Sequence, residues 1–164
     1  MSRAVTPKTI YLASPLGFSH SGSHFIRDVL IPQLTRQRLN VVNPFDLVDP
    51  ARIRAIAEME AGPARIAAWR ALNIEIGQGN VSAIDGCDAM LAVLDGADVD
   101  SGTASEIGYA FAKGKRIVGY RSDFRISADN EGGIVNLQVE YFIRASGGTI
   151  VNSVADIAGG FAGT

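Results

Sequence analysis

The sequence predicts an α/β protein in which about five parallel strands form one doubly wound sheet with helices on both faces. Three observations lead to this prediction. Short apolar runs alternate along the chain with longer segments whose apolar residues recur at helical spacing. The clearest strand, AMLAVL at Ala89–Leu94, is apolar on both faces, as parallel strands usually are. Glycine supplies 18 of the 164 residues, which suits many tight strand–helix turns.

The first strand is expected at Thr9–Ala13, where TIYLA precedes the loop SPLGFSHSGS. A helix is expected over Ser23–Arg38, with a kink at Pro32 because proline has no N–H for the helical hydrogen-bond ladder. Asn40–Val42 is the second expected strand, and an Asn-Pro pair ends it.

Two Ala-rich segments, Pro50–Ala61 and Ala64–Ile84, are expected to be helical because alanine has the highest helix propensity. A Gly-Pro pair separates them, and two glycines weaken the second half of the later one. After the strand at Ala89–Leu94 we expect a helix at Thr103–Lys113 and a strand at Arg116–Tyr120. The polar segment Arg121–Gly133 is expected to form a surface loop. A helix at Asn136–Ala145, a strand at Thr149–Val151 and the start of a terminal helix at Ser153–Ile157 complete the chain.

This alternation implies βαβ units and a flavodoxin-like or Rossmann-like sheet. The chain shows no internal repeat or linker, so residues 1–164 are expected to form a single domain. Ligands of such sheets bind at the carboxyl ends of the strands. The loops after Ala13, Leu94 and Tyr120 are therefore where we expect the functional residues.

Composition excludes several classes of protein. The chain has 17 Asp and Glu residues and 15 Lys and Arg residues, and no block of like charges. We therefore expect neither a nucleic-acid-binding groove nor a polybasic patch that binds membranes. No apolar run approaches the roughly 18 residues of a membrane span, and Cys87 is the single cysteine. His20 and His24 lack a third ligand at matching spacing, so no metal is expected. These features predict a soluble, cytoplasmic protein.

Acidic residues gather directly after the third expected strand. Asp95, Asp98 and Asp100 lie in one loop, and Glu106 follows in the first turn of the expected helix. A helix N-terminus favours an ionised carboxylate, which suits a nucleophile. A second carboxyl group, from Asp100, that donates a proton to the same pocket would complete the pair used in retaining glycosyl transfer.

Each candidate also has a structural explanation. Thr103 and Glu106 have the spacing of a capping box, in which each side chain bonds the other's backbone N–H. The loop acids are common turn formers. The structural explanation for Tyr11 is a half-buried aromatic side chain in a strand, and for Phe18 an aromatic anchor of a loop. Asn80 and Asn136 are explained equally well as helix caps or surface residues.

Four segments together resemble the nucleoside 2-deoxyribosyltransferase family. They are IYLASP at 10–15, Asn80 ahead of IDGCDA at 84–89, DSGTASEIGYA at 100–110 and VNL at 135–137. The most specific of them is the Asp-x-Gly-Thr-x-x-Glu-x-Gly-x-Ala pattern. Their order and spacing agree along nearly the whole chain.

The resemblance implies a role for each matched residue. Glu106 is the expected nucleophile on the anomeric carbon, Tyr11 orients it, and Asp100 helps protonate the leaving base. Asn80 is expected at the base edge, and Asn136 near the sugar hydroxyl, supplied in this family by a neighbouring subunit. The other expected substrate contacts are Phe18 on the base side, with Ser14, Pro15 and Gly102 from the matched motifs. The segment 49–68 is expected to cover the pocket.

The implied activity is exchange of the base of a 2′-deoxynucleoside through a covalent deoxyribosyl-enzyme, with nucleosides and free bases as partners. It implies a homo-oligomer and no cofactor. The main alternative is an N-glycosidase that lets water attack the same intermediate. A phosphoribohydrolase pattern shares only GTASE at 102–106, and a sensing module without turnover would not need Tyr11, Asp100 and Glu106 together.

Overall fold

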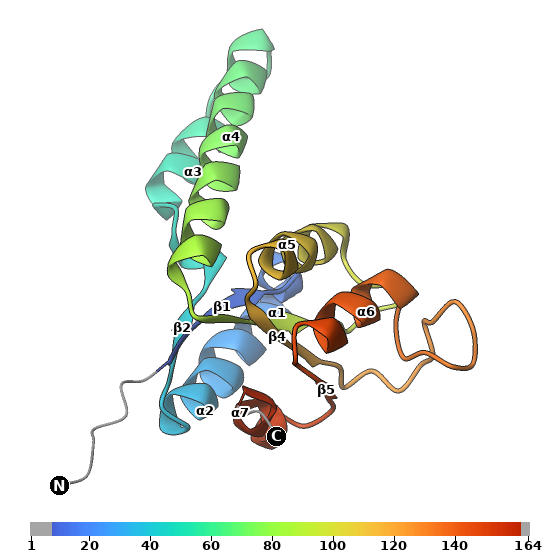
Figure 1. Ribbon diagram of the computed structural model, residues 1–164. Helices are drawn as coiled ribbons and strands as arrows, with labels where there is room; N and C mark the ends of the chain where they lie inside the picture. Colours follow the sequence, from blue (N-terminus) through green and yellow to red (C-terminus); the bar gives the residue numbers. More distant parts are fainter. Residues whose placement is uncertain (1–7, 162–164) are drawn as a thin grey trace, which may run out of the picture.

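The computed structural model describes residues 8–161. Five parallel strands form one sheet in the order β2-β1-β3-β4-β5 (Figure 1). The strands are β1 Lys8–Ala13, β2 Leu39–Val42, β3 Ala89–Val93, β4 Arg116–Tyr120 and β5 Ile150–Val151. The predicted fold class is confirmed, and each strand begins and ends within one residue of its predicted range.

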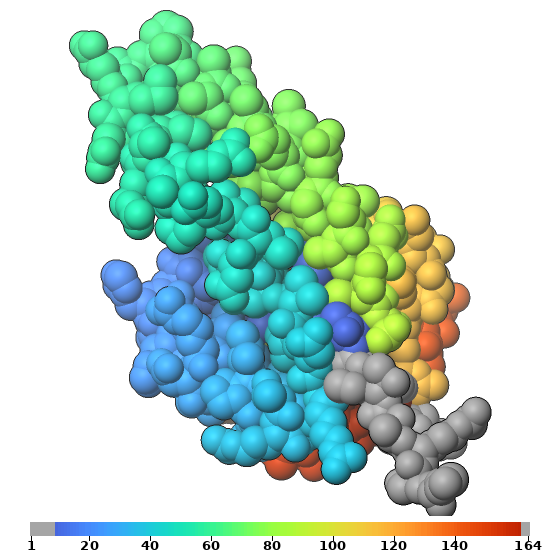
Figure 2. Space-filling view, turned by 90° about the vertical axis from the view of Figure 1, so that its left-hand side faces the viewer, coloured from blue at the N-terminus to red at the C-terminus, as the bar shows by residue number. Residues whose placement is uncertain are grey.

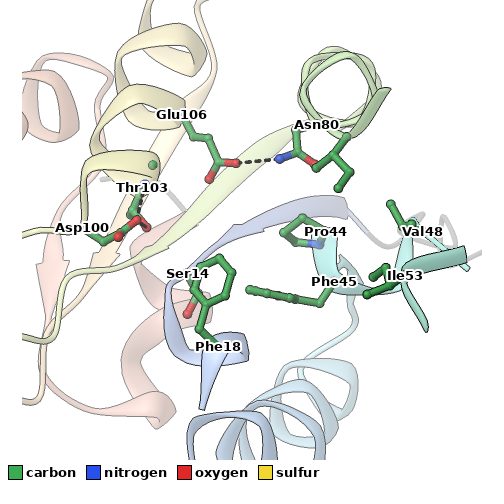
Figure 3. Close-up of a pocket in the computed structure, with 12 residues that line it drawn as sticks. Ser14, Phe18, Pro44, Phe45, Val48, Ile53, Asn80, Asp100, Thr103 and Glu106 are labelled. Carbon is green, nitrogen blue, oxygen red and sulfur yellow. Dashed lines mark hydrogen bonds between the residues drawn. The ribbon is translucent and has the colours of Figure 1, made fainter. Parts of the chain in front are cut away.

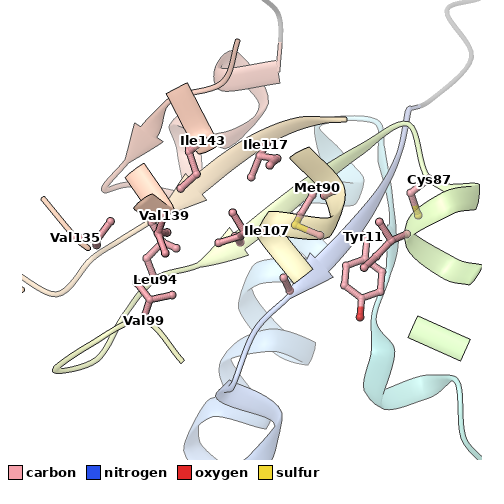
Figure 4. Packing of buried hydrophobic residues seen from close by; sticks show 14 residues of the cluster. Tyr11, Cys87, Met90, Leu94, Val99, Ile107, Ile117, Val135, Val139 and Ile143 are labelled. Carbon is pink, nitrogen blue, oxygen red and sulfur yellow. The ribbon is translucent and has the colours of Figure 1, made fainter. Parts of the chain in front are cut away.

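Helices cover both faces of the sheet because the buried strands are apolar on both sides. One face packs against η2 Phe25–Leu30, α2 Ile31–Arg36, η4 Val154–Asp156 and α7 Ile157–Phe161. The short helix α1 His20–His24 leads into η2. The other packs against α5 Ser101–Ala112 and α6 Leu137–Ala145 (Figure 4). Alternate residues of β1 divide accordingly, with Ile10 and Leu12 on the first face and Tyr11 and Ala13 on the second.

The first helical segment runs from α1 through α2 and changes its hydrogen bonding before Pro32. Within η2 the backbone is π-helical, and the N–H of Ile31 donates to the carbonyl oxygen of Ile26, five residues earlier. Proline cannot donate to the carbonyl of Asp28, so the regular α-helical ladder is interrupted here. The expected disturbance at Pro32 is therefore present, and it takes the form of a π-helical turn.

A helical hairpin projects from the body of the molecule (Figures 1 and 2). It consists of α3 Pro50–Ala57 and α4 Pro63–Gly86. The long helix continues through Gly77 and Gly79, although glycine lowers helix propensity. It buries only Leu72 and Ile84, so most of the hairpin surface faces solvent. No helix among residues 8–161 has the length and apolar character needed to cross a membrane.

The loop after β4 is irregular, as expected, but its first residue is not on the surface. Arg121 is buried, and its guanidinium donates to the carbonyl oxygens of Leu94, Gly96 and Arg125. A buried guanidinium is tolerated because these carbonyl oxygens accept its hydrogen bonds. Arg121 thereby joins the loops that follow β3 and β4.

The strand order places a ligand site at a defined point of the sheet. Since β1 lies between β2 and β3, the chain leaves β1 and β3 toward opposite faces. Such a reversal opens a crevice at the carboxyl ends of the two strands. The short 3₁₀ turns η1 Leu16–Phe18 and η3 Pro44–Asp46 lie at this edge, after β1 and β2.

Candidate active site

A cavity of about 300 Å³ opens at this edge of the sheet (Figure 3). Its polar side is formed by the loop after β1, by α4 and by the first turns of α5, through Ser14, Asn80, Asp100, Gly102, Thr103 and Glu106. Its other side is apolar. Sequence-predicted residues from three distant segments of the chain therefore meet around one cavity.

The shortest contact at the site joins Tyr11 and Glu106. The phenol donates to Glu106 Oε1 at 2.6 Å across 95 positions of sequence. The Tyr11 side chain is fully buried in the hydrophobic cluster on this face of the sheet (Figure 4). Its hydroxyl group meets the Glu106 carboxylate, which lines the cavity. Burial and the carboxylate raise the pKa of Tyr11, so the phenol remains a proton-bearing donor. Because Oε1 accepts this hydrogen bond, Oε2 is the Glu106 oxygen that does not contact the phenol.

The environment of Glu106 differs from the one expected at a helix N-terminus. Because α5 begins at Ser101, Glu106 lies in the second helical turn, beyond the reach of the dipole effect. Burial raises its pKa above the ordinary glutamate value, the hydrogen bond from Tyr11 lowers it, and the negative charge of Asp100 raises it further. The net shift is upward. The expected placement of Glu106 in the first helical turn is wrong, because α5 begins at Ser101.

Asp100 is the N-cap of α5. Its Oδ2 accepts the backbone N–H of Thr103 at 3.0 Å and the Thr103 hydroxyl at 3.4 Å. The capping-box explanation for Thr103 and Glu106 is therefore wrong, since the helix begins two residues earlier and Glu106 caps nothing. The cap occupies Oδ2 and leaves Oδ1 of Asp100 available at the cavity.

Asn80 lies across the cavity from α5, on α4. Its Nδ2 donates to Glu106 Oε1 at 3.4 Å, so this amide contacts the expected nucleophile (Figure 3). The same carboxylate oxygen accepts from Tyr11. Two donors on one oxygen restrict rotation of the carboxylate and direct its reactivity to the other oxygen.

Sequence reasoning missed most of the apolar wall. It comprises Phe18, Pro44, Phe45, Val48, Ile53 and Ile76, of which only Phe18 was predicted. Phe45 meets Phe18 edge to face, with ring centroids 5.0 Å apart. Ile53 lies within the expected cover segment 49–68. The missing signal was available: β2 ends in the same direction as its parallel neighbour, so the loop after Val42 belonged with the other strand ends.

Comparison with known proteins identifies the family of this chain. Residues 10–138 match the family described as nucleoside 2-deoxyribosyltransferase. The chain belongs to this family. The coarse assignment for the chain is therefore an enzyme of the glycosyl-transfer class. No curated protein sequence matches the chain.

Solved structures resemble the chain over most of its length. A conserved protein from Enterococcus faecalis V583 has a TM-score of 0.65 and 23% identity, covering 93% of this chain and 96% of that one. A 2-desoxiribosyltransferase from Leishmania mexicana has a TM-score of 0.56 and 27% identity, covering 81% and 85%. A CMP N-glycosidase from Clostridium botulinum has a TM-score of 0.52 and 19% identity, covering 93% and 96%.

Three of the residues matched to the nucleoside 2-deoxyribosyltransferase pattern do not line this cavity. Tyr11 reaches it only through its hydrogen bond to Glu106. Pro15 precedes η1, where its carbonyl accepts the N–H of Phe18. Asn136 caps α6, accepting the N–H groups of Gln138 and Val139 through Oδ1. Neither Pro15 nor Asn136 contacts the cavity of this chain.

Residues 8–161 contain no group of three or more His, Cys, Asp and Glu side chains placed to hold a metal ion. The two carboxylates of the cavity, Asp100 and Glu106, are engaged instead by hydroxyl, amide and backbone donors. Cys87 is buried, and burial raises the pKa of its thiol.

Proposed function

We propose that this chain is a nucleoside 2-deoxyribosyltransferase that exchanges the base of 2′-deoxynucleosides through a covalent intermediate on Glu106. The observation that carries the proposal is the Tyr11–Glu106 hydrogen bond beside a cavity that is acidic on one side and apolar on the other. A flat, uncharged base fits the apolar wall, while the sugar carbon must approach the carboxylate.

In the first half-reaction, Oε2 of Glu106 attacks the anomeric carbon of the deoxyribose. The bond from this carbon to the base nitrogen breaks, and its electron pair goes to the base. Asp100 gives its proton to that nitrogen and becomes a carboxylate. Tyr11 and Asn80 hold Oε1 during this step, so the attacking oxygen keeps its direction.

The second half-reaction runs the same steps backwards with another base. The incoming nitrogen attacks the anomeric carbon, the ester bond to Glu106 breaks, and Asp100 takes the proton released by the base. One pair of carboxyl groups serves both halves, which gives ping-pong kinetics. The scheme uses only the side chains described and the two bases.

The charge of the cavity favours a nucleoside over its 5′-monophosphate. Two carboxyl groups line the cavity, and no Lys, Arg or His among residues 8–161 does so. A phosphate dianion placed there would meet like charges without a compensating cation.

Hydrolysis is the second candidate, because water attacking the same intermediate needs no further residue. The fold shared with the CMP N-glycosidase supports keeping this candidate. Deoxyinosine incubated with and without adenine separates the two. Formation of deoxyadenosine supports transfer, whereas hypoxanthine released at an equal rate without adenine supports hydrolysis. No release of base in either mixture would contradict both.

We also propose that the active unit is a homo-oligomer. Large apolar side chains of α6 and of the loop between β4 and α6 are exposed, with Phe124 96%, Ile126 79%, Leu137 60% and Tyr141 58% accessible. Such patches usually mark contacts, and a second copy is the commonest partner. The Asn136 cap uses Oδ1, which leaves its Nδ2 for the sugar bound by a neighbour.

Mixing two inactive variants tests this arrangement. Glu106→Ala and Asn136→Ala subunits are each expected to be nearly inactive alone. If Asn136 acts across the interface, mixed oligomers regain some intact sites and activity returns. No recovery after verified subunit exchange, or a fully active monomer in sedimentation, would contradict the proposal.

A further inference from the structure

We propose that Thr103 is a positioning residue for Asp100, and that its hydroxyl directs the carboxyl proton toward the leaving base. This inference rests on the proposed function and deepens it. It concerns how the first turn of α5 prepares one carboxyl group for proton transfer, a task that a simple helix cap does not require.

The two donors of Thr103 converge on one oxygen. Its backbone N–H lies 3.0 Å from Asp100 Oδ2, and its hydroxyl oxygen lies 3.4 Å from the same atom. Thr103 is 2% exposed and lines the cavity beside Asp100 (Figure 3). The hydroxyl is therefore removed from bulk water, and Asp100 is the acceptor found for it within residues 8–161.

The helix cap alone does not explain the hydroxyl. An N-cap aspartate needs only the backbone N–H of the third helical residue, which any amino acid except proline supplies. A buried position of this shape would be filled equally well by valine, without the free-energy cost of burying a hydroxyl. A hydrogen bond from the Thr103 hydroxyl group to the Asp100 carboxyl group explains why this position carries a polar side chain.

Gly102 supports the same arrangement by leaving room. A Cβ atom at this position would lie 3.1 Å from Asp100 Oδ2, tighter than ordinary packing. Gly102 lies in the first turn of α5, so its contribution is clearance and not an unusual backbone angle. A side chain there would press the carboxyl group away from the Thr103 hydroxyl.

The consequence concerns where the proton resides. With two donors directed at Oδ2, the carboxyl proton belongs on Oδ1. When the bond between the sugar and the base breaks, that proton moves from Oδ1 to the base nitrogen. The negative charge left on Asp100 is then stabilised by the donors on Oδ2, which strengthen as the charge develops.

The test compares two substitutions at position 103 on two nucleosides. Thr103→Val keeps the shape and removes the hydroxyl, whereas Thr103→Ser keeps the hydroxyl. Deoxyinosine needs a proton on its leaving base, but 7-methyl-2′-deoxyguanosine, whose base is already cationic, does not. Ser105→Ala is the matched control, since Ser105 donates to the Ser101 carbonyl on the exposed side of the same helix.

For Thr103→Val we expect kcat on deoxyinosine to fall about 10- to 100-fold, the range for a hydrogen bond to a charged group. Its kcat on 7-methyl-2′-deoxyguanosine should stay within about twofold of the wild type, because no proton transfer is needed. Thr103→Ser should recover most of the loss, and Ser105→Ala should resemble the wild type on both substrates.

Equal losses on the two nucleosides, or a Thr103→Ser variant as impaired as Thr103→Val, would overturn the inference and leave the proposed function standing. Thermal unfolding of each variant separates a loss of helix stability from a loss of positioning. A wild-type enzyme that releases no base from either nucleoside would overturn the proposed function and the inference together.

Discussion

The two sides of the cavity differ in how firmly the protein holds them. The two carboxyl groups of the polar side lie on the sheet edge, where Tyr11 is fully buried and α5 is capped by Asp100. The apolar side comes largely from η3 and the projecting hairpin, whose α3 buries no residue and whose α4 buries two (Figure 2). Segments with few buried contacts open and shift more readily.

This contrast assigns different tasks to the two sides. Chemistry needs fixed distances, so the carboxyl groups belong on the packed core. Accepting different bases needs a surface that adapts, which a weakly buried hairpin provides. Substitutions on the polar side should therefore change kcat, whereas substitutions on the apolar side should change KM.

The largest expected effect is that of Glu106→Ala. Turnover should fall by at least about 10³-fold, because no other group can form the covalent intermediate. The fold should persist, since Glu106 caps nothing in α5. Base exchange and circular dichroism measure the two properties. An active variant would break the assignment of chemistry to this side of the cavity.

Asp100→Asn should follow, with a loss of about 10²–10⁴-fold on ordinary nucleosides, the usual contribution of general acid catalysis. The amide keeps a cap oxygen but cannot deliver the proton. A nucleoside with an activated base should lose less. Asp98→Asn, an exposed acid in the same loop, is the control. Equal losses on both nucleosides would indicate a binding role.

Tyr11→Phe should move the acid limb of the pH–rate profile to higher pH. The Tyr11 hydrogen bond lowers the pKa of Glu106, whereas burial and Asp100 raise it. Without the phenol only the raising contributions remain, so at a given acidic pH less Glu106 is ionised. Tyr109→Phe, which loses a hydroxyl bonded to Asp85, should leave the limb in place. An unmoved limb in Tyr11→Phe would show that Glu106 ionisation does not set it.

Ile76→Ala should have the smallest effect and the opposite kinetic signature. Removing part of the apolar wall should raise KM about fivefold, equivalent to about 1 kcal/mol of burial, with kcat within about twofold. Ile74→Ala is the matched control, because Ile74 is 63% exposed on the same helix and does not line the cavity. A fall in kcat at unchanged KM would remove the distinction between the two sides.

The polar side was accessible to sequence reasoning because its residues lie in one local pattern. Asp100, Gly102, Thr103 and Glu106 fall within seven consecutive positions after a strand that its composition alone identifies. Local spacing did not reveal the start of α5, however. The helix begins at Ser101 because Asp100 outcompetes Thr103 as its cap, and this changes the environment of Glu106.

The sequence by itself determined the strand ranges, the α/β class and the residues that the family pattern marks, because apolar periodicity and turn residues are local properties. Only the tertiary structure decided that Asn80 donates to Glu106 and that Phe45 meets Phe18. These contacts depend on how α4 and η3 pack against a sheet edge built from distant segments. The net rise in the pKa of Glu106 has the same origin, since burial is a property of the folded chain.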